Sequence, residues 1–327
     1  MPEVVPIRYR RVQPRVLITG ITGQDGSYLA DQLLVDGCEV IGMVRPGTVL
    51  PAGLVGRVAV VEADLGNDAE LSSAVASVAP DQLFHLAAPS FVPASWDAPA
   101  AVIEQITAAT GTLLRAAAAL GGCRVFVASS AEIFGDCGVS PQTERTAMRP
   151  RTPYGVAKLA AHGLVGAMRQ HFGLFAVSGV LFNHESPRRP DHFLPRKVTR
   201  GAAAIALGLE DELVLGSLDA VRDWSHAADV MRGARLALAA DEPRDYVFAS
   251  GVGRTVGDLV AAAFDAADVP EERRRVVVDP AFVRPAEPYA PVGDASRARS
   301  ALGWTPEISF EAMIAEMVAA DLAALRT

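Results

Sequence analysis

Residues 16–30 read VLITGITGQDGSYLA, and this stretch decides the fold. Its first three residues are apolar and predict a buried strand; glycines follow at 20, 23 and 26, and apolar residues at helical spacing come next. This is the context that a dinucleotide-binding fingerprint requires. Gly20 allows the tight turn, Gly23 lets the backbone approach a pyrophosphate, and Gly26 lets the helix lie close to the strand. An ordinary glycine-rich turn is the alternative, and the position in the first strand–helix turn favours cofactor binding.

Apolar runs and helical patterns alternate along the first half of the chain. We expect strands at 39–44, 58–61, 83–88, 125–132 (running into a turn) and 175–182, and helices at 68–78, 98–120 and from 153. This alternation predicts an α/β fold with a Rossmann-type doubly wound parallel sheet, to which 247–250 returns. A smaller C-terminal α/β part is expected to bind substrate. The expected division is an extension at 1–14, a nucleotide-binding domain at 15–182 with about 220–265, and a substrate part at about 183–219 with 266–327.

Composition narrows the class of protein. The net charge of −8 argues against a broad nucleic-acid surface. No apolar run approaches the roughly 20 residues of a membrane span, and the N-terminus lacks the apolar region of a secretory signal. Three cysteines without metal-like spacing favour a reducing, cytoplasmic setting. The six histidines form no ligand pair at helical spacing, so no metal is predicted.

The residues after the second and third strands bear on the cofactor. Arg45 ends the second strand, where an acidic residue would favour NAD and an arginine suits a 2′-phosphate, so NADP is favoured. A solvated loop arginine is the alternative. Asp64 and Leu65 follow the third strand and are expected to contact the adenine, or Asp64 caps the next helix, or both. After the fourth strand the small residues Ala87 and Ala88 let the backbone pass close to the cofactor, while His85 is expected to be a core histidine.

Two patterns predict acid–base chemistry at the fifth strand. Ser130 and Glu132 would point to the same side of an extended chain, delivering a hydroxyl and a carboxylate together. Tyr154 and Lys158 follow at i and i+4 in the helix that Pro153 opens, so they share one face. A phenol has a pKa near ~10, and a neighbouring ammonium would lower it. A Tyr-x-x-x-Lys pair alone is common by chance; after five strand–helix units it is specific.

At this point the chain resembles the extended short-chain dehydrogenases/reductases, and more narrowly the GDP-mannose 4,6-dehydratases, from Val16 to about Leu322. The most specific runs are ITGQDGSYLA, PYGVAK, LFNHESPRR, RDWSHAADV and DEPRDYVFASG. The resemblance implies the catalytic set Ser130, Glu132, Tyr154 and Lys158, with Ser130 in place of the family's threonine. It implies an NADP site formed by Gly20, Thr22, Gly23, Gln24, Asp25, Gly26, Arg45, Asp64, Leu65, Leu86, Ala87, Ala88, Ser90, Tyr154, Lys158, His184 and Arg189.

The second half of the chain supplies candidates for binding a nucleotide sugar. Asn183 is expected to hydrogen-bond the diphosphate, and Arg222 to hold it with Asp223 orienting the guanidinium. Arg284 would be a second phosphate clamp, and Glu287 would contact a guanine edge. Arg196 and Lys197 begin an amphipathic helix and are expected to reach the nucleotide. The full substrate set is Ser90, Ser130, Glu132, Asn183, Lys197, Arg222, Arg284 and Glu287.

The chain also departs from the family pattern. The segment after Arg45 is short where the family has a longer loop that helps to assemble tetramers, and Ala101 stands near a family tyrosine that contacts the cofactor. Residues 287–291 differ in a region that shapes the sugar pocket. The resemblance implies an even-numbered homo-oligomer, most simply a homodimer through 98–120 and 153–172, or a homotetramer.

The implied activity is a redox-neutral dehydration of a GDP-hexose, most simply GDP-mannose, to a 4-keto-6-deoxy sugar. Glu132 favours it, since a simple epimerase or 4-ketoreductase needs no base for C5. The alternatives are an epimerase or a 4-ketoreductase, a 4,6-dehydratase for another nucleotide sugar such as a GDP-heptose, and a cofactor-binding sensor without turnover. The sensor would be expected to lack Tyr154, Lys158 or Glu132, and all three are present.

Overall fold

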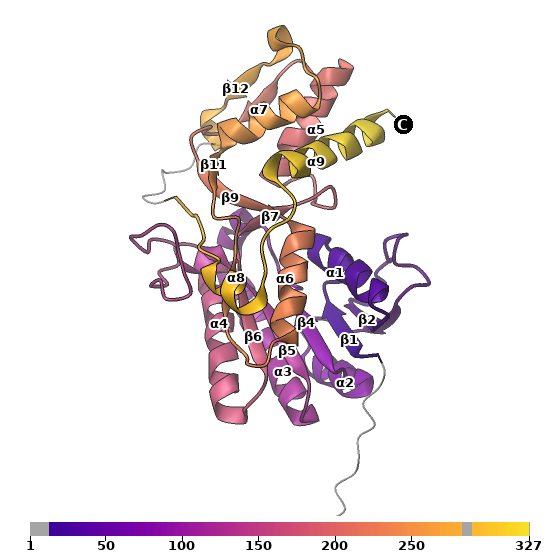
Figure 1. Ribbon diagram of the computed structural model, residues 1–327. Coiled ribbons are helices and arrows are strands. Elements are labelled where there is room, and N and C mark those ends of the chain that lie inside the picture. The colour runs from indigo at the N-terminus through magenta and orange to yellow at the C-terminus, as the bar shows by residue number, and fades with distance from the viewer. Residues whose placement is uncertain (1–12, 283–289, 327) are drawn as a thin grey trace, which may run out of the picture.

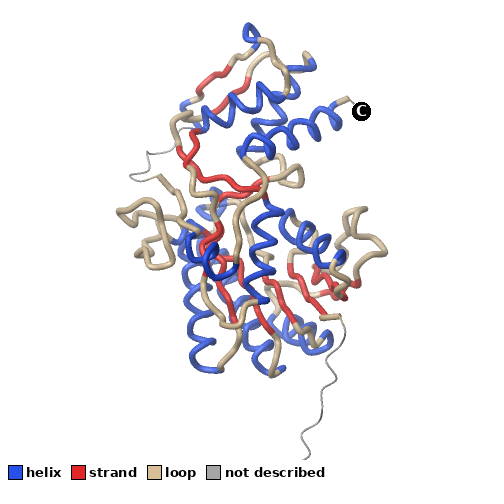
Figure 2. Tube along the Cα trace, viewed as in Figure 1, coloured by secondary structure: helices blue, strands red, loops and turns tan. Residues whose placement is uncertain are grey.

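A seven-stranded parallel sheet forms the body of the protein, as the sequence predicts. The computed structural model describes residues 13–282 and 290–326. The strand order is β10-β6-β5-β4-β1-β2-β3, and every neighbouring pair is parallel. Figures 1 and 2 show this sheet in the lower body, with a smaller lobe above it. The strands are β1 (Arg15–Thr19), β2 (Glu39–Val44), β3 (Ala59–Glu62), β4 (Gln82–His85), β5 (Arg124–Ser130), β6 (Ala176–Leu181) and β10 (Tyr246–Phe248).

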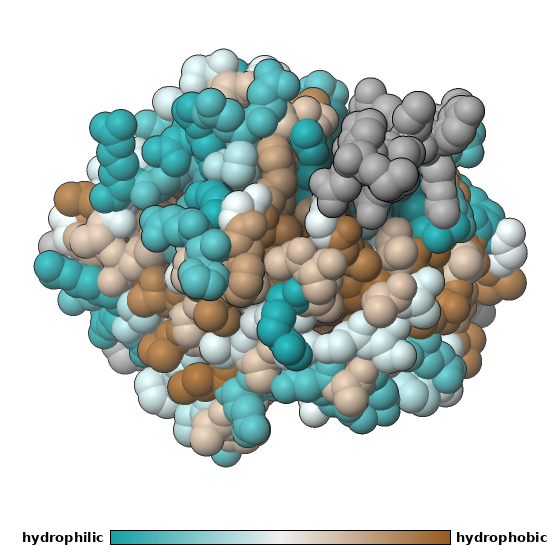
Figure 3. Space-filling model, turned by 90° about the horizontal axis from the view of Figure 1, so that it is seen from below, coloured by the Kyte–Doolittle hydropathy of each residue, from teal (hydrophilic) through white to brown (hydrophobic). Residues whose placement is uncertain are grey.

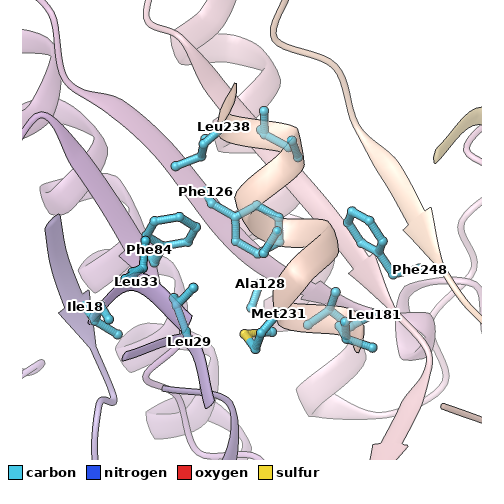
Figure 4. Close-up of a cluster of buried hydrophobic side chains, with 14 of the residues drawn as sticks. Ile18, Leu29, Leu33, Phe84, Phe126, Ala128, Leu181, Met231, Leu238 and Phe248 are labelled. Atoms are coloured by element: carbon cyan, nitrogen blue, oxygen red, sulfur yellow. The ribbon is translucent and has the colours of Figure 1, made fainter. Parts of the chain in front are cut away.

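Helices cover both faces of the sheet, which gives the body two apolar cores. Leu17 and Ile18 are consecutive in β1 and therefore point to opposite faces, one into each core. Figure 4 shows part of the Ile18 side, where Leu29 of α1 and Met231 of α6 lie among strand residues. One face is covered by α1 (Gln24–Val35), α6 (Ala227–Ala239) and α8 (Ser296–Leu302). The other face is covered by α2 (Asp68–Val78), α3 (Pro99–Leu120) and α4 (Pro153–Phe172).

The upper lobe has its own apolar core. Val198, Leu259 and Met317 are buried there, one from each of its three helices. The helices are α5 (Leu194–Leu207), α7 (Val256–Ala266) and α9 (Phe310–Leu325). Two small sheets complete the lobe and its junction with the body: β12-β8 and β11-β9-β7. Their strands are β7 (Asn183–Glu185), β8 (Leu213–Leu215), β9 (Val221–His226), β11 (Gly253–Thr255) and β12 (Val276–Val278).

The packing differs from the expected division of the chain at two helices. We expected the range 220–265 to belong to the body, but α7 packs with α5 and α9 in the upper lobe. We expected 266–327 to belong to the substrate part, but α8 packs against α6 and β10 of the body. Chain order does not decide which core an amphipathic helix covers, because the chain crosses between the two parts several times.

The surface of the body is mixed in polarity. Figure 3, which views the molecule from below, shows polar residues around the edge of this face and apolar residues interspersed among them. Phe172, at the end of α4, is one of the exposed large apolar side chains of the body. Within residues 13–282 and 290–326, no helix combines the length and the apolar character that crossing a bilayer requires.

Candidate active site

Two glycines in the turn after β1, Gly20 and Gly26, stand where a Cβ atom would clash with neighbouring backbone. Gly20 has a φ of +74°, and a Cβ there would lie 2.9 Å from the backbone nitrogen of Ala87. A Cβ on Gly26 would lie 2.5 Å from the Cα of Ile21 and closer still to the Gly20 carbonyl. Gly23 begins α1 without any side-chain cap, so the first N–H groups of this helix are open to a phosphate. The turn therefore fits a dinucleotide.

Thr19, which the sequence analysis did not single out, joins this turn to the exit of β4. Its hydroxyl accepts hydrogen bonds from the backbone nitrogens of Leu86 and Ala87, each at 3.1 Å. These two bonds use both lone pairs of the hydroxyl, so its proton is directed at Nδ1 of His85, 2.8 Å away. The ring can accept it, because burial lowers the pKa of His85 to about 3 and keeps the imidazole neutral. His85 is thus the core histidine that the sequence predicts, and the 86–88 backbone is held beside Gly20.

A partly buried ion pair joins Asp25 of α1 to His184 of β7. Nε2 of His184 lies 2.9 Å from Asp25 Oδ2, and Nδ1 lies 2.7 Å from the Phe182 carbonyl oxygen, so both ring nitrogens face acceptors. Burial lowers the pKa of His184, but the charge and hydrogen bond of Asp25 outweigh it and the net shift is upward. For Asp25, burial raises the pKa, but His184 and Gln24 make the net shift downward. Both shifts therefore favour the ionised forms of the two side chains.

This pair predicts a pH dependence of stability. A group whose pKa is raised on folding contributes stability that is fully present below its unfolded value and is lost as the pH rises through its folded value. For His184 the unfolded value is 6.5. We expect the difference in unfolding free energy between wild type and His184→Gln to shrink as the pH rises above 6.5, measured by denaturant unfolding of cofactor-free protein. A difference that does not change between about pH 6 and alkaline pH would contradict the ion pair.

The other polar residues near α1 are paired with protein groups. Gln24 donates to the His184 carbonyl at 3.1 Å and accepts from the Ser186 hydroxyl at 2.8 Å. Arg189 lies 3.2 Å from the buried Glu185 and stacks on Phe193, and Arg188 pairs with Asp31 at 2.8 Å.

The cofactor candidates after the first three strands are more accessible. Arg45 is exposed directly after β2, and Thr22 is exposed in the glycine turn. The helix cap expected at Asp64 is wrong, because Asn67 caps α2. Asp64 instead accepts a hydrogen bond from the backbone nitrogen of Gly66 within its own turn. Leu65, beside it, is half-buried.

The expected acid–base residues meet at the end of β5. Ser130 caps a short 3₁₀ helix, η2 (Ala131–Ile133), so Glu132 lies in a helical turn and the expected extended alternation is wrong. Ser130 nevertheless lies close enough to Tyr154 to lower the pKa of the phenol, and the charge of Glu132 acts on the same pKa in the opposite direction. Lys158 is buried, donates to the Ala128 carbonyl at 2.7 Å, and lies 5.7 Å from the centre of the Tyr154 ring.

Burial dominates the ionisation of the Tyr154 and Lys158 pair. It raises the pKa of Tyr154 far above the usual phenol value, and Ser130 opposes the rise only in part. It lowers the pKa of Lys158 to about 8. In the protein alone, therefore, the expected lowering of the Tyr154 pKa by the ammonium is wrong, because desolvation exceeds it. Lys158 is still largely protonated at neutral pH, so it remains a cation beside the phenol.

A cavity of about 280 Å³ lies against Tyr154. It is open on one side, where Ser90 and His192 are exposed. The sequence analysis selected Ser90 but missed the aromatic wall, in which Phe91 meets His192 edge-on at 4.9 Å between ring centres. Nothing in the local sequence around 91 or 192 indicates this contact, because it joins distant segments. The lining residues are Pro89, Ser90, Phe91, Ala94, Ser95, Val102, Tyr154, Pro190, His192 and Phe193.

The remaining substrate candidates lie around the junction with the upper lobe. Asn183 in β7 pairs with Trp224 of β9. Arg222 in β9 donates to the Val221 carbonyl at 2.6 Å, and Lys197 on α5 lies 4.5 Å from the ring centre of Phe282. Lys197 also borders a second cavity, of about 450 Å³, between α5 and β8. Arg284 and Glu287 lie outside the described residues.

Two expected roles in this region are wrong. Asp223 does not orient Arg222: it is fully buried and accepts from the backbone nitrogens of Ser250, Gly251 and Gly293 at 2.8–3.1 Å. Arg196 does not reach toward a nucleotide, because it is buried and lies 2.8 Å from Asp321 of α9. Both charged groups serve to join segments that are distant in sequence. Among the described residues, no group of three or more His, Cys, Asp or Glu side chains could hold a metal ion.

The parallel sheet, the glycine turn and the serine, tyrosine and lysine at its carboxyl edge define a short-chain dehydrogenase/reductase. The comparisons with known proteins narrow this class. The family model for GDP-mannose 4,6 dehydratase matches residues 17–317, and the chain belongs to this family.

Curated relatives agree with this assignment, and solved structures share the fold. The GDP-mannose 4,6-dehydratase of Vibrio cholerae serotype O1 is 38% identical, with 94% of this chain and 93% of that protein covered. The human GDP-mannose 4,6 dehydratase is 37% identical over 95% of this chain and 92% of its own. Among solved structures, RMD from Pseudomonas aeruginosa, complexed with NADPH, superposes with a TM-score of 0.82 at 26% identity, covering 95% of this chain and all of that one. A putative epimerase from Burkholderia cenocepacia gives a TM-score of 0.84 at 27% identity, covering 95% and 98%.

Proposed function

We propose that the protein is a nucleotide-sugar 4,6-dehydratase that converts GDP-mannose to its 4-keto-6-deoxy form and releases water. The observation that carries this proposal is the presence of Glu132 beside Tyr154 and Ser130 at the carboxyl edge of the sheet. Oxidation at C4 needs only the hydroxyl, phenol and ammonium groups. Elimination of water across C5 and C6 also needs a base for the C5 proton. Glu132 would supply this base, since its carboxylate is hydrogen-bonded to the N-cap of the helix that carries Tyr154.

The chain's own residues suit each stage of this reaction. Tyr154 would take the proton of the C4 hydroxyl, with Ser130 hydrogen-bonded to both oxygens and the Lys158 ammonium stabilising the phenolate. Glu132 would then remove the C5 proton, which the C4 ketone makes acidic, and the C6 hydroxyl would leave as water. The cavity beside Tyr154 would hold the sugar, with Ser90 at its open edge. A bound dinucleotide would supply a hydride acceptor at C4 and a hydride donor at C6.

We infer that this dinucleotide is NADP. The glycine turn and the uncapped start of α1 fit a pyrophosphate, and Arg45 is exposed at the end of β2, where the 2′-phosphate of NADP would lie. Gly20 to Gly26 would hold the phosphates, Asp64 and Leu65 the adenine, and Leu86 to Ala88 the middle of the cofactor. The solved relatives bind either NADPH or NAD, so the test is direct: nucleotide released from the purified protein by acid is identified by chromatography.

The first experiment incubates purified protein with GDP-mannose, without added cofactor, and measures the mass of the nucleotide sugar. We expect the loss of one water. An isomer of unchanged mass would instead indicate an epimerase, an activity that solved neighbours of this fold carry in their names. An untouched substrate would contradict GDP-mannose as the sugar, and a GDP-heptose would be the next substrate to offer.

We also infer that the protein acts as a homodimer through α3 and α4. These helices pack against each other on one face of the sheet, and their outer surface carries Val156, which is 42% exposed, and the uncrowded Gly163. Light scattering checks this inference, and a monomer at micromolar concentration would contradict it.

A further inference from the structure

Thr152 links the proposed base to the helix that carries Tyr154. It is the N-cap of α4, and its hydroxyl oxygen accepts the backbone N–H of Gly155 at 2.9 Å. The same hydroxyl donates to Oε2 of Glu132 at 3.3 Å. A hydroxyl has one proton and two lone pairs, so it can cap the helix with a lone pair while giving its only proton to the carboxylate.

The surrounding backbone keeps this arrangement tight. A Cβ on Gly155 would lie 2.6 Å from the Glu132 carbonyl oxygen, so the first turn of α4 packs directly on the 3₁₀ turn that holds Glu132. Pro153 fixes the start of the helix, and Thr152 is extended, with φ −126° and ψ 151°. Thr152 and Tyr154 are therefore held at the same helix terminus, and Glu132 is attached to it through the Thr152 hydroxyl.

We propose that Thr152 is a positioning residue for the C5 base, and this rests on the proposed function of Glu132. Proton abstraction from carbon depends strongly on the orientation of the base, and a hydrogen bond to one oxygen of a carboxylate restricts the rotation of that group. The hydrogen bond to Oε2 fixes the carboxylate relative to Tyr154, so the C4 oxidation site and the C5 base keep one geometry. The alternative is that Thr152 has only a structural role, as the N-cap of α4.

Four substitutions separate positioning from capping. Thr152→Ser keeps both the cap and the donor. Thr152→Asn keeps a capping oxygen and brings N–H donors, whereas Thr152→Asp caps equally well but offers Glu132 a negative charge in place of a proton. Asn and Asp are matched in size, so their difference reports the contact with Glu132. Thr152→Val removes both functions and measures the cost of the lost cap by thermal unfolding.

We expect Thr152→Ser to turn over GDP-mannose within about two-fold of wild type. We expect Thr152→Asp to lose about 10- to 100-fold in turnover, which is less than the roughly 10²- to 10⁴-fold that a general base contributes, because the base is misplaced and not removed. The Asp variant should unfold at a lower temperature than the Asn variant, because a like charge that raises the pKa of Glu132 also lowers stability near neutral pH; turnover is therefore compared below the unfolding transition of both variants. Its slow step should be proton removal, so a C5-deuterated substrate should show a larger isotope effect and reduced nicotinamide should build up in the near-ultraviolet absorbance. The acid limb of its pH profile should move to higher pH, because a like charge favours protonation of a carboxylate.

The outcomes distinguish this role from the proposed function. If wild type dehydrates GDP-mannose and Thr152→Asp matches it in rate and isotope effect, Thr152 is only a cap and the positioning role is overturned. If wild type removes no water from the sugar, the proposed function and this role fall together. A Thr152→Asp variant that is slow but shows an unchanged isotope effect and no reduced nicotinamide would also overturn the role, because the loss would then lie outside the C5 step.

Discussion

Glu132→Gln is expected to stop dehydration while leaving the first oxidation of the sugar in place. The amide keeps nearly the same shape and can still meet Thr152, but it cannot accept the C5 proton at neutral pH. We expect turnover to fall by about 10²- to 10⁴-fold, the usual contribution of a general base. Tyr154, Ser130 and Lys158 are untouched, so a single enzyme equivalent of reduced nicotinamide should appear when GDP-mannose is added and should then persist. Rapid absorbance measurement together with mass analysis of the sugar checks both parts.

The matched control is Glu242→Gln, which removes a carboxylate that is exposed on the surface and paired with Arg244. It should dehydrate GDP-mannose at the wild-type rate. Full dehydratase activity in Glu132→Gln would remove the argument for this reaction, since the remaining residues serve an epimerase or a reductase equally well. Loss of both dehydration and nicotinamide reduction would instead mean that Glu132 acts already in the C4 oxidation.

Gly26→Ala is expected to abolish retention of the cofactor. The added Cβ would lie 2.5 Å from the Cα of Ile21 and against the Gly20 carbonyl, and neither backbone atom can move without opening the turn. We expect the free energy of unfolding to fall by about 3 kcal/mol, the upper end of the cost of overpacking. The purified variant should carry less than about a tenth of the wild-type nucleotide, because the phosphate-binding N–H groups of α1 would be displaced. Denaturant unfolding and chromatography of released nucleotide measure the two effects.

Gly53→Ala is the control for this substitution. Gly53 is exposed, and a Cβ there would meet no atom within 4 Å. It should unfold at nearly the wild-type denaturant concentration and retain its cofactor. A Gly26→Ala protein that keeps a full complement of nucleotide would show that the dinucleotide does not lie on this turn.

The body of the fold was predictable because its signals are local. The glycine turn, the strand at Glu39–Val44 and the helix at Asp68–Val78 appear where the sequence predicts them, since each depends on residues that are neighbours in the chain. Tyr154 and Lys158 were predictable for the same reason: the helix that positions them begins at Pro153 and sets their spacing. The roles of the predicted site residues in binding and catalysis remain predictions.

The errors arose where contacts join distant segments or where a cap changes the local geometry. Periodicity does not reveal that Asp223 binds three backbone nitrogens, or that Arg196 meets Asp321 in another helix. Ser130 ends its strand by capping a 3₁₀ turn, so the alternation rule that placed Glu132 was applied two residues too far. Thr152 before Pro153 is a recognisable cap signal, but its second hydrogen bond, to Glu132, required the tertiary structure.

The α9 helix has a consequence for how the protein is made. Its Met313, Met317 and Val318 are almost fully buried among α5 and α7, and its Asp321 neutralises the buried Arg196. During synthesis the six strands from β1 to β6 emerge well before this helix, so the turn that would bind the cofactor can form early. The upper lobe, by contrast, stays without a closed core until α9 has left the ribosome, and Arg196 until then has only Asp191 of its two carboxylate partners. The nascent chain therefore passes through a stage in which the sheet is assembled and the sugar has no complete lobe to bind.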